Sequence, residues 1–406
     1  MGAVSRLHFI ASLLIGLSIP AHADVITDWN DKVVAVGAQT RQSTIVHTRS
    51  VAIVHLAMFD AVNSIDRRYT PYRVQVPTAA GTSREAAAAA AAHFALLRLY
   101  PDQAQDIESL YHTSLAVVPD GEPKSQGIQL GEQVAGEMLA LRAKDGADAP
   151  NTYRPYTVAG TYVPTVLPVG SSWGQVTPFA LKEGSQFRPA APVSLQSAQW
   201  AKDCEEVKKM GAKTGSGRTA EQTDIARLWE LTGPGLHNPV ARQLAATKNF
   251  DVLDNARLLA LYAMAMADAY IAVFDAKYTY NFWRPVTAIR NADNDGNDAT
   301  ERDPVWEPFI ATPMHPEYPC AHCIQTAAGA TVLAAFFGDA VQPFSLTSST
   351  APGVTRRFSR LSDYISESID ARVYDGVHYR TSGEVGAAMG RKIGEYTVQN
   401  YLKPVR

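Results

Sequence analysis

The sequence has 406 residues, of which 37 are Lys or Arg and 40 are Asp or Glu, giving a net charge of −3. This near balance excludes the strongly basic surface that nucleic acids or anionic membranes attract. Three cysteines are too few for a disulfide scaffold, and the length suffices for one large core or for two domains.

The first 23 residues have the pattern of a secretory signal peptide. Arg6 supplies a positive start, an apolar run follows from Phe9 to Ile19, and Ala21-His22-Ala23 resembles a cleavage site. The run is too short to span a bilayer, and later apolar runs are interrupted by charges such as Asp268. We therefore expect an exported protein, periplasmic or secreted, with no membrane span.

The rest of the chain predicts an all-α fold of packed helical bundles. Apolar residues recur at helical spacing, and no run shows strand-like alternation bounded by turns. Thr82 and Glu85 are spaced as a capping box before a run of alanines. The predicted helices are 49–65, 82–100, 124–143, 194–212, 220–231, 252–280, 321–337, 358–373 and 383–402.

Residues 145–193 differ from the rest in composition. Prolines and glycines recur throughout this segment, so it cannot form long helices. Trp173, Phe179 and several tyrosines indicate that it packs over the helices rather than acting as a free linker. We divide the chain into a helical scaffold at 24–250, which includes this connection, and a second helical region at 251–406.

Two basic residues mark the end of the predicted helix 252–280. Lys277 and Arg284 are seven residues apart, so they share one face for as long as the helix persists, and Pro285 then ends it. Cations beside aromatic residues need an anion or a carboxylate. Two interpretations stay open, an oxyanion site or an ordinary basic pair with salt bridges to Asp268 or Asp275.

The stretch Tyr-Pro-Cys-Ala-His-Cys at 318–323 follows a proline-rich loop. Pro316 and Pro319 prevent a helix through His315, and apolar periodicity begins only after Cys320. A helix therefore starts at about residue 320, where free backbone N–H groups can bind an oxyanion. A zinc site lacks a second ligand pair, and a thioredoxin-like site lacks its βαβ context.

A third pattern lies near the C-terminus. Arg372 and His378 are six residues apart, which places them on different faces of a continuous helix. They can converge if the chain bends at Gly376, with His378 near the start of the last helix. A lone histidine in such a place is more often structural than catalytic.

The three stretches in this order resemble the vanadium-dependent haloperoxidases and the related type 2 phosphatidic acid phosphatase superfamily. The shared pattern is Lys-x6-Arg-Pro, then Pro-Ser-Gly-His, then Ser-Arg-x3-Gly-x-His, and it covers about 250–385 closely. "FWRP" at 282–285 and "RVYDGVHYR" at 372–380 look like the haloperoxidase versions. Ser382 stands where the phosphatases have Asp, which also places the chain closer to the haloperoxidases.

This resemblance implies a vanadate cofactor. His378 would bind vanadium, or attack phosphorus in a phosphatase, and His322 would be the acid/base group. His315 resembles a histidine found in haloperoxidases associated with bromide, although a loop-capping role is an equal alternative. The residues implied to contact the oxyanion are Lys277, Arg284, Cys320, Ala321, Arg372 and His378.

The chain departs from the family pattern in its middle motif. Cys320 and Ala321 replace Ser-Gly, and Ala371 replaces the serine before Arg372. A thiol is a weaker hydrogen-bond donor than a hydroxyl, and a disulfide from Cys320 to Cys323 or Cys204 would remove the donor. If it is not bridged, Cys323 is expected to be a free thiol facing the core. Residues 291–302 partly fit a calcium loop, but an Asx-rich turn is the better interpretation.

Three functions follow from these observations. The leading hypothesis is a haloperoxidase that uses hydrogen peroxide to oxidise a halide at bound vanadate, with an organic acceptor. The first alternative is an exported acid phosphatase that hydrolyses a phosphoester through a phosphohistidine. The second is a non-catalytic phosphate-binding protein. All three imply small-molecule partners, and a homo-oligomer stays open.

Overall fold

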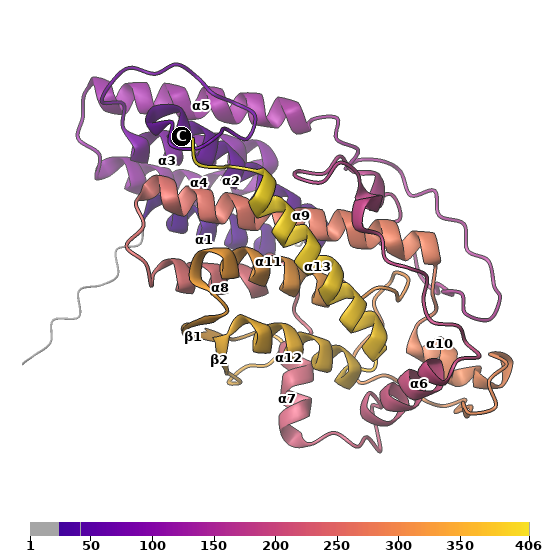
Figure 1. The fold of residues 1–406 in the computed structure, drawn as a ribbon. Helices are drawn as coiled ribbons and strands as arrows, with labels where there is room; N and C mark the ends of the chain where they lie inside the picture. Colours follow the sequence, from indigo (N-terminus) through magenta and orange to yellow (C-terminus); the bar gives the residue numbers. More distant parts are fainter. Residues whose placement is uncertain (1–23, 41, 406) are drawn as a thin grey trace, which may run out of the picture.

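A computed structural model describes residues 24–40 and 42–405, so the expected signal peptide lies outside the described residues. Most of the regular structure in the described part is helical, which confirms the predicted fold class (Figure 1). The helices are α1 (Val25–Gln39), α2 (Thr44–Asp66), α3 (Arg84–Leu99), α4 (Ala104–Ala116), α5 (Glu122–Arg142), α6 (Ala198–Met210), α7 (Ala220–Leu228), α8 (Pro234–Ala245), α9 (Val252–Tyr280), α10 (Pro285–Arg290), α11 (Ala321–Phe337), α12 (Leu361–Tyr374) and α13 (Arg380–Asn400).

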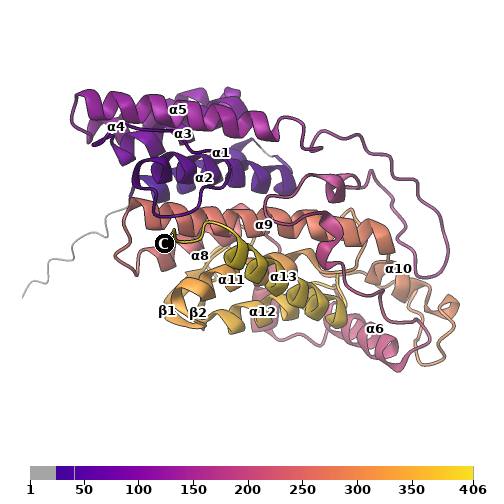
Figure 2. The same ribbon diagram turned by 45° about the horizontal axis from the view of Figure 1, so that its top comes forward.

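The helices form two groups with α9 between them. Figure 2 shows α1–α5 on one side of α9 and α8 with α11–α13 on the other. The helices α2 and α9 are long and apolar enough to cross a membrane by length and composition, but 89% and 94% of their apolar windows are buried inside the protein. They are therefore packed as core helices, which fits their nearly uniform apolar surface.

One cluster of buried side chains extends from Ile26 to Leu402. It contains residues from both sides of the boundary that we placed at residue 250. The helices of the two segments share one apolar core. The division into 24–250 and 251–406 stays a prediction.

Several predicted details are wrong. The N-cap of α3 is Ser83, whose side chain accepts from Ala86 N, rather than Thr82. The helices α1, α4, α8 and α10 were not predicted, nor was the hairpin of β1 (Ala340–Leu346) and β2 (Arg356–Arg360). In this antiparallel pair Phe344 lies opposite Phe358. Both rings are buried against α12, which explains why so short a hairpin is ordered.

The connection 145–193 packs over the helices, as predicted. The carboxylate of Asp268, buried within α9, accepts hydrogen bonds from the backbone N–H groups of Phe179, Ala180 and Leu181 at 2.7–2.8 Å. Further along the fold, Tyr162 N donates to Asn281 O at 2.8 Å and Trp283 N donates to Gly160 O at 3.0 Å. Backbone pairing thus places this connection beside the chain that follows α9.

Candidate oxyanion site

The helix α11 begins at Ala321, with Cys320 as its N-cap, as the sequence predicts. Cys320 and Cys323 form a disulfide, while Cys204 is a buried free cysteine. The sulfur of Cys320 also accepts from Cys323 N at 3.2 Å. Cys320 is fully buried, and a bridged sulfur has no hydrogen to donate, so the helix N-terminus keeps only backbone donors toward an anion.

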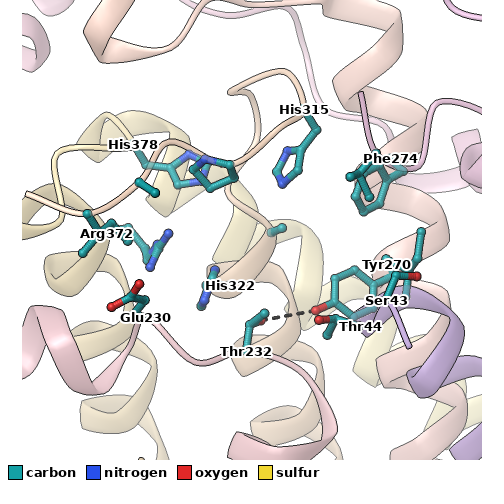
Figure 3. Close-up of a pocket in the computed structure, with 16 residues that line it drawn as sticks. Ser43, Thr44, Glu230, Thr232, Tyr270, Phe274, His315, His322, Arg372 and His378 are labelled. Atoms are coloured by element: carbon teal, nitrogen blue, oxygen red, sulfur yellow. Dashed lines mark hydrogen bonds between the residues drawn. The ribbon is translucent and has the colours of Figure 1, made fainter. Parts of the chain in front are cut away.

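A cavity of about 380 Å³ opens at this helix N-terminus. Figure 3 shows His322, Arg372, His378 and His315 around it, and Ala321 lines it as well. The far wall comes from the start of α2, the end of α9 and the segment before α8, through Ser43, Thr44, Ile45, Thr232, Tyr270 and Phe274. Four predicted side chains and one predicted backbone position therefore meet at one cavity.

Arg372 and His378 converge because the chain bends at Gly376, as predicted. Gly376 has φ 79°, a conformation that favours glycine, and a Cβ there would lie 2.3 Å from Gly211 O. The bend brings His378 N to 3.2 Å from Arg372 O. His378 lies two residues before α13, so both side chains reach the cavity from the junction between α12 and α13.

Lys277 and Arg284 do not share a helical face, and this prediction is wrong. The helix α9 ends at Tyr280, and Asn281 then turns the chain with a left-handed φ of 50°. Arg284 is instead the N-cap of α10. The seven-residue spacing would align them only in a helix continuing to residue 284, and Asn281 ends it earlier.

Both cations are nevertheless buried beside the cavity. Arg284 donates from Nη1 toward His378 Nε2 at 3.2 Å and from Nε to His315 O at 2.9 Å. Lys277 Nζ donates to the carbonyl oxygens of Pro316 and Glu317 at 2.9 and 2.7 Å. Neither is among the residues that line the main cavity. They stand directly behind its histidines.

The alternative salt bridges for these cations are not formed. Asp275 pairs with Arg188 at 2.7 Å, and Asp268 accepts from the backbone of the connection. Glu317 is a carboxylate whose pKa the charges of Lys277 and Arg284 lower, against the larger effect of burial. Neither of the two expected salt bridges therefore accounts for the burial of these cations.

Glu317 is a site residue that the sequence analysis missed. Its Oε1 lies 2.7 Å from His378 Nδ1 and also accepts from Tyr379 N at 3.2 Å. When Glu317 is ionised it can only accept, so Nδ1 of His378 then carries the proton and the lone pair of Nε2 faces Arg284. The sequence feature that could have indicated this role is the single acidic residue of the motif, which stands between Pro316 and Pro319.

Two further acids near Arg372 were also missed. Asp375 is fully buried and forms an ion pair with Arg372, whose Nη1 also donates to Trp229 O at 3.1 Å. Glu230 lines the cavity beside Arg372 (Figure 3). Asp375 lies inside the Arg372–His378 motif but was not assigned a role there, whereas Glu230 lies outside the three motifs and reaches Arg372 only through the packing of the chain after α7 against α12.

Burial controls the charge state of the site. Burial, followed by the charges of Arg284 and Lys277, lowers the pKa of His378 well below its usual value. Burial and then Arg372 do the same for the pKa of His322. Burial raises the pKa of Glu317 to about 7, against the opposing effect of Lys277. Both histidines are therefore neutral near pH 7 and available as acceptors.

The polar atoms left free in the cavity fit an oxyanion. His322 Nε2 and Arg372 Nε are buried and have no hydrogen-bond partner among the described residues. The N–H groups of Ala321 and His322, at the start of α11, have no partner within the helix. Such buried unpaired groups are costly unless a ligand satisfies them. An anion with several oxygens, at least one of them protonated, such as vanadate or phosphate, matches these donors and the acceptor Nε2 of the neutral His322.

The loop 291–302 is an Asx-rich turn. Asp295 is buried, and its carboxylate accepts from Trp200 Nε1 at 2.8 Å, Asn297 N at 2.8 Å and Thr300 Oγ1 at 2.8 Å. In the described ranges, no group of three His, Cys, Asp or Glu is arranged to hold a metal ion. The carboxylate that a calcium site would need is thus engaged in structural hydrogen bonds.

Comparison with known proteins gives a consistent result. Residues 257–406 match a family model described as the VCPO second helical-bundle domain. The vanadium chloroperoxidase of Curvularia inaequalis is 24% identical over 358 residues, covering 68% of this chain and 58% of the relative. The chain thus spans well under two thirds of that relative's length.

Two solved bacterial structures have the same fold. A bacterial vanadium-dependent iodoperoxidase superposes with a TM-score of 0.79 at 25% identity, covering 94% of this chain and 97% of that one. A holo-type bacterial vanadium-dependent chloroperoxidase superposes with a TM-score of 0.69 at 18% identity, covering 88% and 91%. The likeness includes the N-terminal helices, which the family model does not cover.

Proposed function

We propose that this chain, which is related in fold and C-terminal sequence to the vanadium-dependent haloperoxidases, is an exported haloperoxidase. In this proposal it binds vanadate and uses hydrogen peroxide to oxidise a halide to hypohalous acid. The observation that carries the proposal is the meeting of His322, Arg372 and His378 at one cavity, with Arg284 bonded to His378 behind it. The pattern of residues 1–23 supports export.

The residues that would hold vanadate have polar atoms that are either unpaired or able to exchange their present hydrogen-bond partner for the anion. His378 Nε2 would be the ligand, Arg372 and Arg284 would neutralise the oxygens, and the N–H of Ala321 would add a neutral donor. Lys277 has one ammonium hydrogen beyond its two carbonyl bonds. Bound vanadate would supply a Lewis acid that activates hydrogen peroxide at a constant oxidation state.

The chain's own groups prepare this chemistry. Glu317 holds the proton of His378 on Nδ1, which keeps Nε2 available as a lone pair. His322, neutral because it is buried, can accept a proton from hydrogen peroxide at its unpaired Nε2 and return it to a leaving hydroxide. The apolar wall around Phe274 excludes bulk water and strengthens these interactions.

The test is a titration of the purified apo-protein with orthovanadate during bromination of monochlorodimedone by hydrogen peroxide. We expect activity that appears with vanadate, saturates, and is absent without it. Parallel samples with and without a thiol reductant separate the effect of the Cys320–Cys323 disulfide. An absence of bromination in all arms, at vanadate concentrations where binding is saturated by calorimetry, would refute the haloperoxidase assignment.

A phosphatase is the second candidate, and the Glu317–His378 pair is the observation that favours it. A histidine held by a carboxylate can act as a nucleophile toward phosphorus and form a phosphohistidine. Turnover of p-nitrophenyl phosphate without vanadate, inhibited when vanadate is added, would favour this function. Phosphate binding with neither activity would instead support a non-catalytic phosphate-binding protein.

A further inference from the structure

A second cavity lies next to the oxyanion site and is larger, at about 480 Å³. Arg284 borders it, and Pro313 lines both cavities. The two cavities therefore lie on either side of a wall made by Arg284 and the 313–315 loop. The residues that line the second cavity include two arginines and no Asp or Glu.

Tyr162 contributes an unusual polar group to this cavity. The side chain is only 4% exposed, and its hydroxyl makes no hydrogen bond to any residue in the described ranges. Its position is fixed, because the backbone of 160–162 pairs with that of 281–283 and so holds Tyr162 next to Arg284. The hydroxyl oxygen lies at the surface of the cavity rather than sealed inside the protein, so it can bond a molecule there. Here the available partner is a molecule in the cavity.

Arg290 supplies a positive charge on the same wall. Its Nε donates to Trp306 O at 2.8 Å, while within the described part of the chain its other two nitrogens have no hydrogen-bond partner and no ion pair. Glu307 is the acid close enough to feel this charge, but it is ion-paired with Lys213 at 3.0 Å. The guanidinium edge of Arg290 is thus free for a carboxylate, which it matches in geometry.

The mouth of this cavity is apolar. Val166 and Met314 line it with 50% and 44% of their surfaces exposed, and the neighbouring Leu167 is 78% exposed. Val169 N bonds to Met314 O at 2.8 Å, which holds the two apolar segments side by side. Exposed apolar side chains grouped around a concave site favour a ligand with an apolar body.

We propose that this second cavity binds the organic acceptor of the halogen, and that the acceptor is an aromatic carboxylate. The carboxylate would pair with Arg290, a ring hydroxyl or the carboxylate itself would reach Tyr162, and the ring would contact Val166 and Met314. The volume fits a ligand of this size and greatly exceeds a lone inorganic anion. This inference rests on the proposed haloperoxidase function for its chemical step, but not for the binding itself.

The chemistry balances with the reagents already named. Hydrogen peroxide, a halide ion and one proton give hypohalous acid and water. The hypohalous acid then transfers its halogen to a ring carbon, the ring loses the proton from that carbon, and the released hydroxide takes up this proton to form water. A cavity that shares a wall with the first would hold the ring within a short diffusion path of the halogenating agent.

The experiment uses 4-hydroxybenzoate as the probe and measures its binding to the apo-protein by calorimetry. We expect Arg290→Gln to weaken binding at least about tenfold, as for loss of a charge-assisted bond, and Tyr162→Phe to weaken it about two- to tenfold. Arg290→Lys keeps the charge and should retain part of the affinity, which separates charge from misfolding. Arg391→Gln, at an exposed position on α13, is the matched control and should bind like the wild type.

Two further arms locate the probe and separate the proposals. Saturating orthovanadate should leave 4-hydroxybenzoate binding unchanged, and the neutral 4-hydroxybenzamide should bind more weakly than the acid. Competition by orthovanadate, or full affinity in Arg290→Gln, would place the probe elsewhere and overturn the inference. Intact probe binding without any bromination would refute the haloperoxidase proposal alone, whereas bromination without probe binding would refute the acceptor site alone.

Discussion

His378 Nδ1 lies 2.7 Å from Glu317 Oε1, although the two residues are 61 positions apart in the sequence. Both side chains are almost completely buried, and the same carboxylate oxygen accepts from Tyr379 N. Glu317 also sits beside Ser382, the position at which the related phosphatases carry their acid. The carboxylate partner of the histidine therefore comes from the loop before α11 rather than from α13 itself.

Replacing Glu317 by Gln should weaken vanadate binding about tenfold, within the range seen when a partner of a metal-binding histidine is lost. A neutral amide fixes the Nδ1–H tautomer less firmly and makes Nε2 less basic. Vanadate affinity is measured by calorimetry on Glu317→Gln and on Glu395→Gln, an exposed control on α13. Wild-type affinity in Glu317→Gln would show that the pair is structural only.

Replacing His322 by Ala should separate binding from turnover. We expect vanadate affinity within about threefold of the wild type, because Arg372, Arg284 and His378 remain, and a loss of bromination of about 10²- to 10⁴-fold. The matched control is His112→Ala, at an exposed histidine on α4 whose side chain is 80% exposed. Equal losses of binding and turnover in His322→Ala would assign it to holding the anion rather than to proton transfer.

The limits of a helix could be predicted where apolar residues occupy nearly all of its positions. The predicted limits 252–280 and 321–337 agree with α9 and α11 because these helices are apolar on nearly every face. The helix α4 was missed because it buries only Ile107 and has little apolar pattern. The strand β1 contains Pro343 and β2 buries only Phe358, so neither shows alternation that could be recognised without their tertiary contacts.

Only those features of the site that follow from its three sequence motifs could be predicted. The bend at Gly376 and the helix start at Ala321 follow from local chemistry, and both were predicted. The left-handed turn at Asn281, which separates Lys277 from Arg284, has no comparable signal because asparagine adopts this conformation only where tertiary structure favours it. Glu317 was missed because its partner is set by how α11 and α13 pack.

Cys320→Ser should strengthen vanadate binding about two- to twelvefold, the value of one neutral hydrogen bond. The bridged sulfur of Cys320 has no hydrogen to donate, whereas a serine at this N-cap could still accept from Cys323 N and donate its hydroxyl hydrogen toward the anion. Reductant should reproduce part of the gain in the wild type. The matched control is Cys323→Ser, which frees the thiol of Cys320 without adding a hydroxyl beside the anion.

The measurement is vanadate binding by calorimetry for the wild type and both variants, with and without reductant. We expect the order Cys320→Ser, then Cys323→Ser, then oxidised wild type, from tightest to weakest. Unchanged or weaker binding by Cys320→Ser would mean that residue 320 does not face the anion. The backbone of α11 and His322 would then account for all of the loop's contribution.

Asp268 makes a pH-dependent contribution to stability that Asp268→Asn should remove. Burial raises the pKa of Asp268 to about 6, above the ordinary value of 3.8, so the folded state holds the proton more tightly than the unfolded state. The associated stability is present in full below about pH 4 and is lost as the pH rises through 6. Between pH 5 and 7.5 the wild type should therefore lose about 1 kcal/mol that the variant does not lose.

Asp268→Asn should also be less stable at every pH, by about 1–3 kcal/mol, because its amide group faces backbone N–H donors that the carboxylate now satisfies. Urea unfolding at pH 5 and 7.5 measures both effects. Asp60→Asn should behave alike, since Asp60 also accepts from three backbone N–H groups and burial raises its pKa to about 6. The exposed Asp298→Asn is the control, and an equal pH response in all four proteins would contradict the assigned role of these buried carboxylates.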